Sequence, residues 1–316
     1  MDLLFVADPI ETFKPYKDSS FAMMREAAAR GHRLLACTPG ELRWRNGGPV
    51  TGRVRAVTLT GELEDWVRAG ETHEMALRDA GAVLMRKDPP FDSEYFYATH
   101  LLQQAEREGA RVFNKPSALR EHPEKLAILE FPQVIPPTLV TRDAADVRAF
   151  HAEHRDIILK PLDGMGGMGI FRVGADGLNL GSIIETLNRH GTTTIMVQRF
   201  LPEITKGDKR ILIIGGAPVP FSLARIPQGS EIRGNLAAGG KGVAQPLSER
   251  DFEIARGIGP VLAARGLLLV GLDVIGDCLT EINVTSPTCF QEIRQQSGCN
   301  VAGIFIDALE RVAVAR

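Results

Sequence analysis

Short apolar runs and amphipathic stretches alternate along the first third of the chain. Apolar runs at 3–7, 32–37, 82–85 and 111–113 predict buried strands, and amphipathic stretches after Asp18 and across 94–108 predict helices. Segments 42–45 and 50–57 flank Asn46-Gly47-Gly48, which predicts a hairpin. This alternation indicates a small α/β domain with a mostly parallel sheet, in which ligands bind at the carboxyl ends of the strands.

The pattern changes after 131–140, a segment with three prolines in ten residues that predicts a linker. Beyond it, strands are expected in antiparallel pairs, at 157–160 with 170–173, 211–214 with 219–224, and 267–275 with 279–283. Helices are predicted at 144–154, 180–190, 249–265 and 301–314. Paired strands covered by helices indicate an α+β region after the α/β domain.

Length and composition narrow the class of protein. A chain of 316 residues is too long for one compact core, so two or three domains sharing a cleft are expected. Lys and Arg total 37 against 39 Asp and Glu, which argues against a nucleic-acid surface. The amino terminus lacks a basic signal-peptide segment, and the apolar stretch at 267–275 is too short to cross a bilayer. Four cysteines without a C-x-x-C pair predict reduced thiols and a cytoplasmic protein that binds no membrane.

Two glycine-rich segments are candidates for ligand contact. Gly164, Gly166, Gly167 and Gly169 lie between two predicted strands, where the backbone can fold tightly and present N–H groups to an anion. Lys160 ends the preceding strand, within reach of a phosphate, although a solvated lysine at a strand end is the alternative. Segment 225–242 has five glycines and few large apolar residues, so it is either a slack connection or a lid centred on Arg233.

Charged residues in the predicted hairpins are the remaining candidates. Glu281 and Asn283 are two residues apart and share one strand face, with Asp273 on the partner strand. These three side chains offer the oxygen ligands that Mg²⁺ accepts, unless they form an ordinary polar sheet face. Arg210 and Arg225 on adjoining strands repel unless an anion such as a phosphoryl group lies between them. A surface ion pair between Arg210 and Asp208 is the alternative.

Long motifs in the chain together resemble the bacterial glutathione synthetase family of the ATP-grasp superfamily. They are DPI from Asp8, KDSSFAM from Lys17, LMRKDPPFD from Leu84, NKP from Asn114, DIILKPLDGMGG from Asp156, ARIPQG, RGNLAAGG, VGLDVIGD and TEINVTSPT. The resemblance implies an α/β substrate domain at 1–122, a central ATP-grasp subdomain at 123–200, and a carboxyl-terminal subdomain at 201–316. It also implies a lid at 226–241 and a homo-oligomer.

Site residues follow from the same resemblance. ATP, the co-substrate, is expected to contact Lys125, Lys160, Gly164, Gly166, Gly167, Gln198, Arg199, Phe200, Leu201 and Asp208. Mg²⁺, or Mn²⁺ in its place, is expected on Asp273, Glu281 and Asn283. Catalytic roles are implied for Arg210, Arg225, Arg233 and Gly240. The γ-glutamylcysteine pocket is expected at Asp18, Ser19, Ser20, Arg86, Ser286 and Thr288.

The implied reaction is the ATP-dependent ligation of γ-glutamylcysteine and glycine through an acyl phosphate. Such a reaction depends on positioning and charge stabilisation, and no protein nucleophile is needed. The sequence leaves two alternatives: a ligase of the same fold that acts on other amino acids or dipeptides, and a nucleotide-binding regulatory protein without turnover. The complete set of Arg210, Arg225, Asp273, Glu281 and Asn283 disfavours the second.

Overall fold

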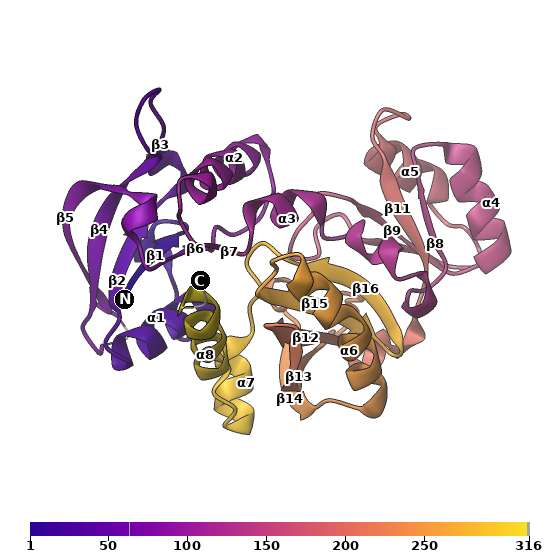
Figure 1. Cartoon of the computed structure of the whole chain (residues 1–316). Helices are drawn as coiled ribbons and strands as arrows, with labels where there is room; N and C mark the ends of the chain where they lie inside the picture. The colour runs from indigo at the N-terminus through magenta and orange to yellow at the C-terminus, as the bar shows by residue number, and fades with distance from the viewer. Residues whose placement is uncertain (63, 315–316) are drawn as a thin grey trace.

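Three β-sheets follow one another along the chain. The computed structural model describes residues 1–62 and 64–314. The sheets form separate lobes, and Figure 1 shows the first at one end, the second at the other and the third between them. No helix of the described residues is both long and apolar enough to cross a membrane.

The first sheet has a parallel centre and an antiparallel extension. Its strands are β1 (Asp2–Val6), β2 (Arg33–Cys37), β3 (Leu42–Arg43), β4 (Thr51–Leu59), β5 (Val67–Ala76), β6 (Ala82–Met85) and β7 (Val112–Phe113). β1 pairs in parallel with β2 and β6, and β6 with β7. The expected hairpin is present as β3 and β4, whereas the long strand β5, which pairs antiparallel with β4, was not predicted. The parallel core of the α/β prediction is thus confirmed and extended.

Strand β1 is buried on both faces because helices cover the sheet from two sides. Leu3 and Phe5 share a core with helices α1 (Ser19–Ala29) and α8 (Val301–Val314). Leu4 and Val6 point the other way, into a core with α2 (Ser93–Arg107). Figure 1 shows α2 on one side of the sheet, with α1 and α8 on the other. Continuous apolar strands of this kind are typical of parallel sheets covered on both faces.

The second sheet is antiparallel throughout. Its order is β10-β9-β11-β8, with β8 (Thr138–Thr141), β9 (Ile157–Pro161), β10 (Phe171–Val173) and β11 (Ile195–Arg199). Helices α4 (Ala144–His154) and α5 (Leu180–Asn188) supply Val147, Leu180 and Ile184 to its core. The linker prediction for 131–140 was wrong in part, because β8 begins at Thr138 and pairs with β11. Pro137 is the last proline of this segment, and three of the four strand residues after it, Thr138, Val140 and Thr141, are β-branched.

The third sheet carries the predicted charged hairpins. Its order is β14-β13-β12-β15-β16, with β12 (Asp208–Ile214), β13 (Ala217–Ile226), β14 (Lys241–Pro246), β15 (Leu269–Ile275) and β16 (Cys278–Asn283). Helix α6 (Glu249–Ala264) packs on β12 and β13. Both predicted hairpins, β12–β13 and β15–β16, are confirmed, and strand β12 joins them by pairing with β15.

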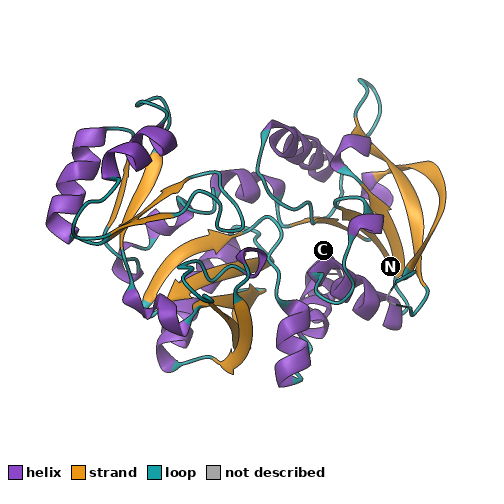
Figure 2. Ribbon diagram, turned by 180° about the vertical axis from the view of Figure 1, so that it is seen from behind, coloured by secondary structure: helices purple, strands orange, loops and turns teal. Residues whose placement is uncertain are grey.

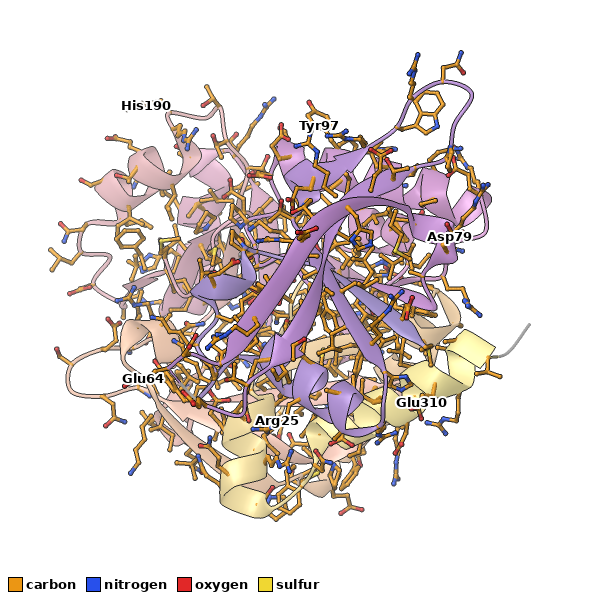
Figure 3. The ribbon with its side chains drawn as sticks, turned by 90° about the vertical axis from the view of Figure 1, so that its left-hand side faces the viewer. Arg25, Glu64, Asp79, Tyr97, His190 and Glu310 are labelled. Atoms are coloured by element: carbon orange, nitrogen blue, oxygen red, sulfur yellow. The ribbon has the colours of Figure 1, made fainter. Side chains whose placement is uncertain are left out.

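The last two helices return to the first lobe. After α3 (Pro116–Glu121) leads out of that lobe, α7 (Phe290–Ser297) and α8 come back to it, as the view from behind in Figure 2 also shows. Arg30 after α1 donates to Asp307 and Glu310 of α8 at 2.6 and 3.1 Å. Figure 3 labels Arg25 and Glu310 in this region, which lies below the first sheet. The carboxyl-terminal helices therefore tie the first lobe to the third sheet.

Candidate active site

A cavity of about 670 Å³ opens where the three lobes meet. A cavity of this size suits a small-molecule site. Its wall combines the loop before α1, the glycine loop at 164–168, the end of β11, the segment 232–237, and the charged ends of β12, β13, β15 and β16. Residues more than 250 positions apart in the sequence thus face the same cavity, and all three lobes contribute to its wall.

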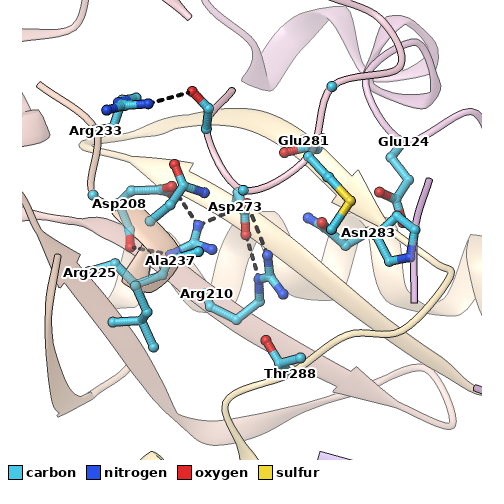
Figure 4. A pocket seen from close by; sticks show the side chains of 18 of the residues that line it. Glu124, Asp208, Arg210, Arg225, Arg233, Ala237, Asp273, Glu281, Asn283 and Thr288 are labelled. Carbon is cyan, nitrogen blue, oxygen red and sulfur yellow. Dashed lines mark hydrogen bonds and ion pairs between the residues drawn. The ribbon is translucent and has the colours of Figure 1, made fainter. Parts of the chain in front are cut away.

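Two arginines and one aspartate form the floor of the cleft. Arg210 is opposite Asp273 in the β12–β15 register, and Arg225 lies on the neighbouring strand β13. Nε of Arg210 donates to Oδ1 of Asp273 at 2.6 Å, and Nη2 of Arg225 lies 2.8 Å from Oδ2 (Figure 4). Burial acts to raise the pKa of Asp273, but the two guanidinium groups outweigh it and hold that pKa well below its usual range. The anion expected between the arginines is, in this structure, the Asp273 carboxylate.

Asp208 belongs to the same ionic group as the two arginines and Asp273, but its partner differs from the one expected from the sequence. The alternative of a surface pair with Arg210 is wrong, because Asp208 is buried and bonds to Arg225 instead. Burial raises the pKa of Asp208 to about 6, although the charge of Arg225 acts against this. Oδ1 of Asp208 has no hydrogen-bond partner among residues 1–62 and 64–314. Asp208 therefore offers an unused buried acceptor at the cleft wall.

Two buried lysines point into the cleft beside this group. Nζ of Lys125 donates to Oε1 of Glu281 at 3.1 Å and also to the carbonyl of Gly164. Lys160 is 6% exposed, and among the described residues its Nζ has one hydrogen-bond partner, the carbonyl of Thr280 at 3.3 Å. Burial lowers the pKa of Lys160 to about 8, partly offset by the negative charge of Glu281. A buried ammonium with one long hydrogen bond is well placed to bind an added anion.

The three expected metal ligands differ in whether their side-chain oxygens already accept from arginines. Glu281 and Asn283 both line the cleft, and the Asn283 side-chain nitrogen donates to the Gly271 carbonyl at 3.3 Å, a contact that does not use the side-chain oxygen. Both Asp273 oxygens, in contrast, already accept from arginines. Within the described part of the chain, no cluster of three His, Cys, Asp or Glu residues forms a metal site. Glu281 and Asn283 thus fit a hard cation whose remaining ligands come from a substrate.

The glycine loop and the predicted lid are in contact. Nη1 of Arg233 donates to the Gly167 carbonyl at 3.2 Å, and Arg233 also pairs with Glu231, which lowers the pKa of Glu231 to about 2. A Cβ atom on Gly167 would lie 2.7 Å from Oδ1 of Asn235. Glycine at this position, where φ is +86°, therefore allows both the turn and the close approach of the lid.

Residues at the end of β11 form the opposite wall. Gln198, Arg199, Phe200 and Leu201 all line the cleft, together with the apolar side chains of Pro136, Ile158, Ile170 and Ile204, which the sequence analysis did not include. The guanidinium of Arg172 stacks on the Phe200 ring at 3.7 Å from its centroid. Asp156 holds Arg172 by two hydrogen bonds of 2.9 and 2.6 Å. The Phe200 ring is therefore fixed against this wall.

The residues expected around the peptide substrate lie at two depths. Asp18, Ser286 and Thr288 line the cleft, whereas Ser19, Ser20 and Arg86 lie behind its wall and are buried. Arg86 donates from Nε to Ser20 Oγ at 3.1 Å and from Nη2 to the Pro287 carbonyl at 3.0 Å. Ser19 Oγ accepts from the backbone N–H of Phe290 at 3.3 Å. These three residues join the start of α1 to the loop before α7.

Glu124 is a cleft residue that was not predicted from the sequence. Its Oε1 accepts from the backbone N–H groups of Val284 and Thr285 and from Thr285 Oγ1, at 2.9, 3.0 and 2.8 Å. It precedes Lys125, so two consecutive residues hold the end of β16 and the glycine loop. Its acidic neighbour Glu281 and its own burial raise the pKa of Glu124, burial being the larger cause. In the sequence, its position next to Lys125 was the one feature that pointed to a place in the cleft.

Comparison with known proteins places these features in a family context. A model described as the N-terminal domain of prokaryotic glutathione synthetase matches residues 1–120, and the model of its ATP-grasp domain matches residues 124–298. The chain is 63% identical to the glutathione synthetase of Ralstonia nicotianae over 99% of this chain and 96% of that protein. It is 58% identical to the glutathione synthetase of Bordetella parapertussis, covering 99% of this chain and 100% of that protein.

Solved structures of other ligases share the fold. The crystal structure of D-cycloserine synthetase DcsG aligns with a TM-score of 0.67 at 14% identity, covering 99% of this chain and 100% of that one. An ATP-grasp ligase of Chryseobacterium gregarium, in complex with ADP and peptides, aligns with a TM-score of 0.67 at 15% identity, covering 98% of this chain and 97% of that one. At such low identity, these likenesses concern the fold alone.

Proposed function

The chain belongs to the prokaryotic glutathione synthetase family and is an ATP-dependent ligase that forms glutathione, and we propose that the cleft between its three lobes is where γ-glutamylcysteine and glycine are joined. The observation that carries this proposal is the buried group of Arg210, Arg225 and Asp273 on the cleft floor. Guanidinium groups fixed in advance by a carboxylate are suited to stabilise charge that develops on a transferring phosphoryl group.

ATP is proposed to lie between the second and third sheets. Lys125 and Lys160 would contact its phosphates, with the backbone of Gly164, Gly166 and Gly167. The adenine would lie against 198–201, where the fixed ring of Phe200 and the apolar wall offer a flat surface. Asp208, with its unused oxygen, would accept from the nucleotide.

The reaction proceeds in two transfers. An oxygen of the cysteinyl carboxylate attacks the γ-phosphorus of ATP, the bond from that phosphorus to the bridging oxygen breaks, and ADP leaves. The glycine amine then attacks the acyl carbon, loses a proton, and inorganic phosphate leaves as the peptide bond forms. Arg210 and Arg225 balance the negative charge in both transfers, and the enzyme acts by positioning and electrostatics.

A divalent cation, Mg²⁺ or Mn²⁺, is proposed to accompany the nucleotide. Glu281 and Asn283 would hold it through their cleft-facing oxygens, with Asp273 close by on the next strand. Such an ion neutralises phosphate charge when it is bound. The oxygen-rich donor set favours these hard cations over zinc or copper.

The lid at 226–241 is proposed to exclude water from the acyl phosphate. An acyl phosphate is readily hydrolysed, so closure before the amine attacks prevents its loss. Arg233 would lock the lid through its bond to the glycine loop. Gly240 would permit the lid to fold back on itself, because a Cβ there would lie 2.0 Å from the Gly234 carbonyl oxygen.

Domain boundaries, cellular compartment and partners are also proposed. We infer a substrate domain at 1–122 and ATP-grasp subdomains at 123–200 and 201–316, the last two residues of which lie outside the described residues. The four cysteines are free, which suits the cytoplasm, and the nearly balanced charge argues against nucleic acid as a partner. A homo-oligomer without membrane contact is proposed as the working form.

Substrate tests address the proposed function directly. We expect the purified enzyme to release one phosphate for each glutathione formed from ATP, γ-glutamylcysteine and glycine. A panel of other acyl peptides and amine acceptors serves as the comparison. Faster turnover of a different dipeptide would identify a ligase of another specificity, and nucleotide binding without any turnover would support a regulatory role instead.

We expect nucleotide binding to depend on pH through Lys160. Its pKa of about 8 in the folded protein is below its unfolded value, so the buried charge costs stability below pH 8, and that cost disappears as pH rises towards about 10.4. Phosphates stabilise the charged form, so ATP binding should take up about half a proton at pH 8, and affinity should fall at higher pH. Calorimetry in buffers of different ionisation enthalpy measures this uptake. Equal uptake in Lys160→Met would show that Lys160 is not responsible.

A further inference from the structure

One arm of the cleft extends away from the arginines towards the first lobe. The loop before α1, with Lys17 and Asp18, forms one wall, and Thr288 and Glu292 form the other. Gln291 and Gln295 of α7 donate to the carbonyls of Pro15 and Tyr16 at 2.7 and 3.3 Å, which holds the two walls together. This arm is therefore built as a fixed pocket.

The arm begins next to the reacting centre. Cys289 follows Thr288, is buried, and lies near enough to Arg210 and Arg225 for their charges to act on its pKa, which burial raises. Glu292 is in the first turn of α7, three residues farther along. A peptide whose reacting carboxylate lies at the arginines can thus extend its other end towards Glu292.

Glu292 carries an unused acceptor in this arm. Its Oε2 is buried and has no hydrogen-bond partner within 1–62 or 64–314. Burial raises the pKa of Glu292, and the positive charge of Lys17 acts against the rise. Leaving a buried acceptor unpaired is costly, so a site of this kind favours a ligand that brings a donor. Asp18 is a weaker candidate, because its Oδ1 caps α1 by accepting from Phe21 N at 2.7 Å.

We propose that Glu292 determines specificity for the peptide by accepting a hydrogen bond from the α-ammonium group of its γ-glutamyl end. This inference rests on the proposed function of the cleft. The γ-glutamyl end carries both an ammonium and a carboxylate. Glu292 and the nearby Lys17 present a negative and a positive charge that complement these two groups. A charged donor would satisfy the free Oε2 and keep Glu292 ionised.

Three peptides separate this role from a structural one. They are γ-glutamylcysteine, glutarylcysteine, which lacks the ammonium, and 4-aminobutanoylcysteine, which keeps the ammonium and lacks the α-carboxylate. In Glu292→Gln, kcat/KM should fall roughly 10- to 100-fold for the two peptides with an ammonium and stay unchanged for glutarylcysteine. ATP affinity should also be unchanged. Glu185→Gln, an exposed change on α5, is the matched control and should alter none of these values.

Each other outcome overturns the inference. An equal loss for all three peptides would mean that Glu292 acts only through the shape of α7, and no loss for any would mean that the ammonium is bound elsewhere. Wild-type activity on γ-glutamylcysteine is the separate check on the proposed function. If the wild type fails to use that peptide, the function itself is wrong, whatever Glu292 does.

Discussion

Asp273→Ala is expected to impair both folding and turnover. The change leaves Arg210 and Arg225, which are 6% and 5% exposed, without the carboxylate that now lies between them. Breaking a buried ion pair by removing one partner lowers the free energy of unfolding by about 3–5 kcal/mol. Turnover should fall by roughly 10²–10³-fold, because the guanidinium groups lose their fixed orientation. Urea unfolding and steady-state kinetics measure the two effects.

A neighbouring aspartate provides the control for this change. Asp277 is exposed in the turn between β15 and β16, so Asp277→Ala should change neither quantity. Asp273→Asn keeps the side-chain shape and removes the charge, and it should lose stability as well. Unfolding curves of Asp273→Ala and Asp277→Ala that coincide would show that Asp273 is not the counter-ion on which this part of the sheet depends.

Gly240→Ala is expected to uncouple phosphate release from glutathione formation. The added Cβ would meet the Gly234 carbonyl oxygen at 2.0 Å, and this clash is with backbone, which cannot rotate away. The lid would then lie away from the glycine loop, water would reach the acyl phosphate, and glutathione formation should fall about 10²-fold. Phosphate released per glutathione, measured in one reaction, should rise above one.

A glycine outside the lid provides the control that distinguishes a loss of lid closure from a general effect of replacing glycine with alanine. Gly257 is exposed on α6, and a Cβ there would meet nothing within 4 Å. Gly257→Ala should therefore keep wild-type turnover and a ratio of one. The apo form of Gly240→Ala should unfold at the wild-type temperature, since the lid contributes little to the core. A ratio of one in Gly240→Ala would mean that the lid does not protect the intermediate.

Local sequence determined most of the elements. The helices α4 and α8 have the predicted bounds, and the four predicted hairpins are present, because apolar periodicity and turn residues act within a few positions. Some elements were missed: β5 is largely exposed and β14 follows directly from the glycine-rich lid, so both have weak local signals, and the buried strand β11 was not predicted although it begins with an apolar run. The long motifs indicated the family, which the family models and relatives confirmed.

Tertiary structure decided which charges meet. Arg210 and Asp273 are 63 positions apart, and only the pairing of β12 with β15 sets them opposite each other. Likewise, Glu124 has ordinary local surroundings and meets the end of β16 only in the folded chain, and Glu292 comes to face the loop before α1 because its neighbour Gln291 binds that loop. Strand register between distant segments depends on the packing of the whole sheet, whereas helix and turn formation depends on neighbouring residues. Sequence alone therefore supplied the chemical groups, and the fold determined their partners.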